Sequence, residues 1–191
     1  MKRFLWAVLV TFSGMLFAAD SEPEYRLRLD KNNVATITLP NNPTLEKRLR
    51  ADLGYEEDAS AIVGAVLDLN DDHHVDFLVR SSASLCGTGG CPYSIIDGKQ
   101  PRVLGQVFGN PLLIDRQKIH GYPVIHAYWH LSAAEGNFTK YVFDGATYVA
   151  VVAVSLTTES VVKLFDVLNN VPRYNDQQAQ PGSSPNITSK P

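Results

Sequence analysis

The sequence predicts an α+β protein, built mainly from antiparallel β-sheet or a small barrel, with two short flanking helices. Short apolar or alternating segments separated by Gly-, Asn- and Asp-containing turns recur over residues 61–154, as in antiparallel β-proteins. Residues 43–53 and 158–169 instead carry apolar side chains at helical spacing. The chain of 191 residues is long enough for one domain with a substantial core.

Residues 1–19 are expected to be a cleaved secretory signal peptide. Lys2 and Arg3 are basic, residues 4–17 form an apolar run, and Ala18 and Ala19 are the small residues that signal peptidase prefers. Without Lys2 and Arg3 the chain has 15 basic and 20 acidic residues, a net charge of −5. We therefore expect a periplasmic or secreted protein that binds no nucleic acid and does not stay inserted in a membrane. Its expected partner is another periplasmic or extracellular protein.

The strands are expected in two groups. Residues 25–29 and 34–39 are separated by turn-forming residues, which predicts an N-terminal hairpin. Seven further strands are expected at residues 61–67, 75–80, 93–97, 102–107, 122–129, 139–143 and 147–154. This regular spacing of strand, turn and strand favours antiparallel pairing.

The chain resembles itself when it is shifted by 47 residues. Each copy would contain a strand, a loop, a strand that ends in Asp-Gly, and a returning strand. The matching residues include His73, Asp97 and Gly98 in the first copy and His120, Asp144 and Gly145 in the second. Both a true repeat and a chance register among β-rich segments explain the match.

Two amphipathic helices flank these strands. In the first, at 43–53, Asn42 is a suitable N-cap and Gly54 stands where a C-terminal glycine belongs. The second is expected at 158–169, and from residue 172 the chain is polar, Pro-rich and without apolar periodicity. The expected organisation is therefore a signal peptide at 1–19, a single β-rich domain at 20–171 and a disordered tail at 172–191.

An acidic loop at residues 68–76 is the most informative segment. Its alternate positions hold oxygen donors with the spacing that can surround one calcium ion. The candidate ligands are the side chains of Asp68, Asn70, Asp72 and Asp76 and the backbone carbonyl of His74. A second hypothesis needs no metal, because the same side chains can accept backbone N–H groups in a β-turn. Calcium is the one cofactor that the sequence suggests.

This loop resembles the FG-GAP and VCBS-type loops of β-propeller repeats, whose pattern is DxNxDGxxD followed by an apolar strand. His73 stands where that pattern has Gly, and Val79 at the twelfth position excludes an EF-hand. Together with the CGTGGC segment that follows, the loop also resembles a group of small exported bacterial β-proteins. The resemblance implies an exported β-protein with a calcium loop, and it implies no particular activity.

The only two cysteines, Cys86 and Cys91, enclose Gly-Thr-Gly-Gly. An even pair in an exported chain predicts a disulfide. Glycines in such a tip can expose backbone N–H groups to a partner, and the alternative is a stiff hairpin end needed only for folding. The candidate partner contacts are Gly87, Thr88, Gly89 and Gly90.

The expected function is binding or protein interaction. The C-x4-C spacing resembles the loop of a family of periplasmic inhibitors of vertebrate-type lysozyme, although the His and acidic residue of that loop are missing here. An inhibitor or immunity protein of a cell-wall hydrolase is therefore the alternative, and a small hydrolase is the third class. Because no GxSxG, P-loop or GxGxxG motif occurs, we assign no catalytic residue. His126, Tyr128 and His130 share a strand face and form the alternative contact surface.

Overall fold

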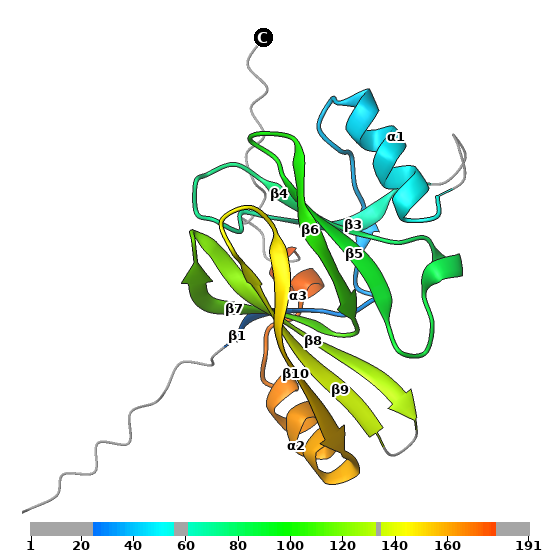
Figure 1. The fold of residues 1–191 in the computed structure, drawn as a ribbon, viewed down its shortest axis with the longest axis vertical. Coiled ribbons are helices and arrows are strands. Elements are labelled where there is room, and N and C mark those ends of the chain that lie inside the picture. Colours follow the sequence, from blue (N-terminus) through cyan, green and yellow to red (C-terminus); the bar gives the residue numbers. More distant parts are fainter. Residues whose placement is uncertain (1–24, 56–60, 133–134, 179–191) are drawn as a thin grey trace, which may run out of the picture.

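The computed structural model describes residues 25–55, 61–132 and 135–178, which form two antiparallel five-stranded sheets (Figure 1). Sheet A has the order β1 (Tyr25–Leu29), β7 (Leu112–Ile119), β8 (Tyr122–Ser132), β9 (Glu135–Phe143) and β10 (Tyr148–Thr157). Sheet B has the order β2 (Ala35–Thr36), β3 (Val63–Leu67), β4 (Asp76–Arg80), β5 (Cys91–Asp97) and β6 (Arg102–Gly109). The predicted fold class is confirmed.

The helices in this part of the chain are α1 (Pro43–Asp52), α2 (Thr158–Leu168) and α3 (Tyr174–Gln178), with a 3₁₀ turn at Ala83–Leu85. The caps of α1 follow the local sequence signals, since Asn42 Oδ1 accepts a hydrogen bond from the Leu45 N–H at 3.1 Å. Gly54 ends the helix with a φ of +68°. None of these helices is long and apolar enough to cross a membrane.

Three apolar clusters divide the protein into layers. The largest fills the space between the two sheets and includes Leu27, Leu78, Tyr93, Leu104 and Ile125. A second cluster joins the leucines of α1 to β4 and β5 on the outer face of sheet B. A third joins α2 to sheet A through Leu113, Phe138, Phe165 and Leu168. The layers are therefore α1, sheet B, sheet A and α2.

The residues aligned by the 47-residue shift have matching local geometry. β4, β5 and β6 fall on β8, β9 and β10. Asp97 Oδ1 accepts the N–H groups two and three residues later, both at 3.0 Å, and Asp144 Oδ1 does the same, both at 2.8 Å. His73 and His120 both have positive φ, +65° and +50°. Each sheet is thus a meander of the same design with one N-terminal strand added at its edge.

The predicted N-terminal hairpin is wrong. β1 pairs with β7 in sheet A, whereas β2 pairs with β3 in sheet B. The segment between them crosses from one sheet to the other, so the turn residues at 30–33 do not return the chain onto β1. β7 was not predicted, because Asp115 and the polar residues after it interrupt the apolar pattern, and its pairing with β8 is irregular at the same place.

The prediction of a disordered tail is wrong for residues 172–178. The Tyr174 side chain is 2% exposed in the core between the sheets, and its hydroxyl accepts a hydrogen bond from the Val66 N–H at 2.9 Å. The Arg28 N–H also donates to the Pro172 carbonyl at 2.8 Å. The predicted signal peptide at residues 1–19 and the predicted tail at residues 179–191 lie outside the described residues.

Candidate functional site

The acidic loop joins β3 to β4, and its side-chain oxygens accept hydrogen bonds from its own backbone. Asp68 accepts from the N–H groups of Asp72 at 3.2 Å and His73 at 2.9 Å. Asn70 Oδ1 also accepts from the Asp72 N–H at 3.1 Å, and Asp72 Oδ1 accepts from the His74 N–H at 2.9 Å. Within the described residues, no three His, Cys, Asp or Glu side chains converge as metal ligands. The arrangement is that of a hydrogen-bonded turn.

The backbone of the loop is left-handed at Asp71 and His73, with φ of +60° and +65°. His73 occupies the position where the DxNxDG pattern has Gly. Its positive φ is a conformation that Gly adopts readily, which is consistent with the preference of that pattern for Gly. The Asp71 carboxylate pairs with Lys118 and, at 3.7 Å, with Arg26. The hydrogen bond from Lys118 is the largest cause that lowers the pKa of Asp71. These pairs tie the loop to sheet A.

Asp76 connects the acidic loop to the β5–β6 turn. Its carboxylate is 1% exposed and accepts the N–H groups of Leu69 at 3.0 Å and Gly98 at 3.1 Å. Burial raises the pKa of Asp76 to about 6, and the nearby negative charges of Asp97 and Asp72 act in the same direction. Asp76 therefore changes protonation close to neutral pH.

The cysteine tip contains the predicted disulfide between Cys86 and Cys91. The N–H of Gly87 donates to the Gly90 carbonyl at 2.9 Å, and the N–H of Gly90 donates to the Gly87 carbonyl at 3.3 Å. Gly90 is buried, and a Cβ there would lie 2.5 Å from the Gly109 backbone. Of the four candidate contact residues, only Gly87 and Thr88 are exposed, and Gly89 is half-buried.

The alternative contact surface on β8 is mostly covered. His126 and Tyr128 are 8% and 4% exposed, and the Tyr128 ring meets Phe165 of α2 at a centroid distance of 5.4 Å. His126 Nε2 lies 3.3 Å from Asp115 Oδ2 inside the protein. The prediction that these side chains form a contact surface is therefore wrong for His126 and Tyr128, because α2 packs over Tyr128 and the rings of Tyr25 and Phe138 pack against His126. His130 is exposed.

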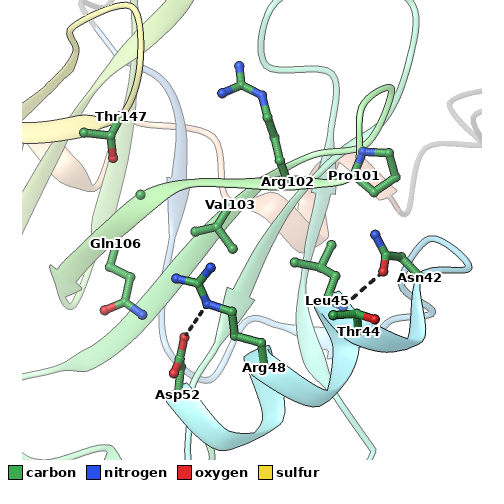
Figure 2. Close-up of a pocket in the computed structure, with 11 residues that line it drawn as sticks. Asn42, Thr44, Leu45, Arg48, Asp52, Pro101, Arg102, Val103, Gln106 and Thr147 are labelled. Carbon is green, nitrogen blue, oxygen red and sulfur yellow. Dashed lines mark hydrogen bonds and ion pairs between the residues drawn. The ribbon is translucent and has the colours of Figure 1, made fainter.

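An open groove of about 870 Å³ lies between α1 and β6 (Figure 2). Leu45 and Val103 supply its apolar part. Asn42, Thr44, Gln106 and Thr147 supply polar groups along its length. Thr147 belongs to the β9–β10 turn, and its hydroxyl donates to the Leu104 carbonyl at 2.9 Å. One end of the groove therefore lies where the β9–β10 turn of sheet A contacts β6, the edge strand of sheet B.

The charged side chains in the groove are Arg48, Asp52 and Arg102. Arg48 Nε lies 3.4 Å from Asp52 Oδ2, and the Arg48 side chain is 70% exposed. Arg102 is 47% exposed and lies 3.6 Å from Asp97, which is outside the groove. Among the described residues, the lining thus has one more positive than negative side chain, in a chain whose net charge is −3. Sequence reasoning missed this groove, since no local motif connects a helix arginine to a strand arginine.

No protein-family model, no curated protein and no solved structure matches the chain. The resemblances based on the DxNxD loop and the CGTGGC segment therefore remain predictions from those residues alone.

Proposed function

We propose that the chain is an exported binding protein that holds an acidic, extended segment of another periplasmic or extracellular protein in the groove between α1 and β6. The groove itself carries this proposal. Arg48 and Arg102 offer planar donors that fit carboxylates, and their exposed side chains can turn toward a ligand. Gln106 and Thr147 can bind backbone groups, while Leu45 and Val103 accept an apolar side chain.

The side chains that line the groove support binding rather than hydrolysis. Within the part of the chain that the structure describes, the lining has a single carboxylate, Asp52, which already pairs with Arg48. General acid–base catalysis needs a group that can exchange protons near the operating pH. That group must also lie beside the bond that breaks. The groove instead supplies hydrogen-bond donors and positive charge, which suit a ligand that is held and not transformed.

The first test compares Arg48→Glu with Lys47→Glu. Both residues are exposed on α1, and only Arg48 lines the groove. We expect Arg48→Glu to weaken retention of the partner about tenfold, or about 1.4 kcal/mol, because attraction becomes repulsion. Lys47→Glu should leave retention nearly unchanged. Retention of periplasmic proteins on the immobilised variants is measured, with thermal melts as a check on folding.

The inhibitor alternative has its own observation, the exposed Gly87 and Thr88 at the disulfide tip. In the same retention experiment, Thr88→Trp adds bulk at this tip without removing a buried contact. Loss of retention in Thr88→Trp together with normal retention in Arg48→Glu would move the binding site to the tip. Normal retention in both variants would reject both surfaces.

Calcium binding by Asp68, Asn70, Asp72, His74 and Asp76 remains a proposal beside this function. The left-handed backbone at His73 supports it, since the calcium-loop pattern has Gly there. The buried Asp76 also supports it, because its carboxylate lies near the charges of Asp72 and Asp97, and a cation would favour the ionised form. In the alternative hypothesis, a hydrogen-bonded turn, the same oxygens accept backbone N–H groups and no ion is bound.

Melting temperatures, measured at several pH values with and without calcium, test the raised pKa of Asp76 and the calcium hypothesis in one experiment. The folded pKa of Asp76 is about 6, above its ordinary 3.8. The stability contributed by the neutral carboxyl is therefore complete below about pH 4 and is lost as the pH rises through about 6. If the loop binds calcium, millimolar calcium raises the melting temperature at pH 7, and Asp72→Ala removes the increase. Asp166→Ala, on exposed α2, is the control. A melting temperature that neither calcium nor a chelator changes would contradict calcium binding and favour the hydrogen-bonded turn.

A further inference from the structure

β10 forms one edge of sheet A, and most of it is exposed on both faces. Successive side chains of a strand point to opposite faces, yet all of residues 150–155 are exposed. Val151, Val152 and Val154 are each about half exposed, at 49%, 50% and 49%. Figure 1 shows β10 running from the turn beside β6 to the end of the sheet next to α2.

The sequence of β10 contains few features that would protect this edge from pairing with another chain. Its sequence, YVAVVAVSLT, has no charged residue and no proline. Exposed edge strands usually carry charges, proline or a bulge that prevents pairing with another chain. β10 has only an irregular pairing with β9 between Ala150 and Val152. A strand of this kind is a template for a further strand.

Helix α2 adds to the same apolar area. It follows β10 directly and contacts it, and its Val162 and Val167 side chains are 56% and 54% exposed. The apolar area, termed the β10 surface, consists of Val151, Val152, Val154, Val162 and Val167. These five half-exposed valines lie on two elements that contact each other, and apolar exposure concentrated in one region of a surface marks a contact between proteins.

We propose that the β10 surface binds the same surface of a second copy of this chain. Two β10 strands would pair in antiparallel fashion about a twofold axis and join two five-stranded A sheets. The pairing satisfies the edge N–H and C=O groups of both strands. It also brings uncharged residues against uncharged residues, so that no buried charge is left without a partner.

Residues 56–60 and 179–191, which lie outside the described residues, fit this edge less well. Residues 56–60 read EEDAS and are acidic, and residues 179–191 contain three prolines, which cannot donate to a strand ladder. The latter segment follows α3, which contacts β1 at the opposite edge of sheet A. A second β10 is ten residues long, uncharged and free of proline, so it has the chemistry that this edge needs.

Molar mass in solution tests the dimer. The full chain is expressed, exported and purified from the periplasm, and its mass is measured by light scattering during size exclusion. We expect the mass of two copies at about 100 µM, a concentration at which even a weak dimer forms. Val152→Lys combined with Val154→Lys should give the mass of one copy. The control is Leu85→Lys, which changes an apolar residue, 46% exposed, outside the β10 surface and should stay dimeric.

A cysteine variant locates the contact independently of the lysine variants. In a pairing centred on Val152, the Val152 side chains of the two copies lie directly opposite each other on one face, so Val152→Cys should form a disulfide between copies under mild oxidation, while Leu85→Cys should not. A wild-type mass of one copy at the same concentration would overturn the proposal. A dimer that keeps its mass in the double lysine variant and forms no Val152→Cys cross-link would overturn it as well.

Discussion

A Gly98→Ala variant is expected to lose about 3 kcal/mol or more of the free energy of unfolding. Gly98 follows β5, and its N–H donates to Asp76 at 3.1 Å. A Cβ at Gly98 would lie 1.7 Å from the Val75 carbonyl oxygen and 3.1 Å from the Phe77 ring. The carbonyl belongs to the backbone that leads into β4, so it cannot move away without disturbing sheet B. Chemical denaturation monitored by circular dichroism measures the loss.

Gly145→Ala is the matched control, because Gly145 is the counterpart of Gly98 after the 47-residue shift. Gly145 has a φ of +103°, and a Cβ there would have no neighbour within 4 Å. Its substitution should cost only backbone strain, about 1–2 kcal/mol. Equal losses in the two variants would contradict the contact as the cause of the larger effect.

Those parts of the fold that depend on local interactions were predictable from the sequence. The start and end of α1 follow from Asn42, Pro43 and Gly54, because caps act within one helical turn. The partners of β1 and β2 were not predictable in the same way. Turn residues between two strands indicate that the chain changes direction, whereas the choice of sheet depends on apolar contacts with strands far along the sequence.

The acidic loop depends on local interactions and was predictable, whereas the groove depends on long-range packing and was not. The loop lies within nine residues, so its spacing predicts which oxygens point inward, and their hydrogen-bonded use was one of the two hypotheses. The groove depends on Leu45, which packs α1 against sheet B and places Arg48 opposite β6. No sequence pattern shows this packing. The exposure of β10 was not predictable either, because a run of valines indicates a strand and does not show whether another element covers it.

A Tyr174→Ala variant should lose about 3–5 kcal/mol of the free energy of unfolding, the usual cost of deleting a buried aromatic ring. The Tyr174 ring lies in the core between the sheets, and its hydroxyl accepts a hydrogen bond from the Val66 N–H at 2.9 Å. The polar sequence around it gave no sign of this burial, because a single apolar residue has no periodicity. Its contribution should be visible in chemical denaturation and in the melting temperature.

Tyr174→Phe separates the ring from the hydroxyl. This variant keeps the apolar contacts and loses the hydrogen-bond acceptor for the Val66 N–H, which should cost about 1–3 kcal/mol. The order of stability is then wild type, Tyr174→Phe, Tyr174→Ala. Wild-type stability in both variants would mean that residues 172–178 contribute nothing to the fold and that the disordered tail begins at residue 172. The expected graded loss would instead make α3 part of the domain, held between β1 and β3 by this side chain together with the hydrogen bond from the Arg28 N–H to the Pro172 carbonyl.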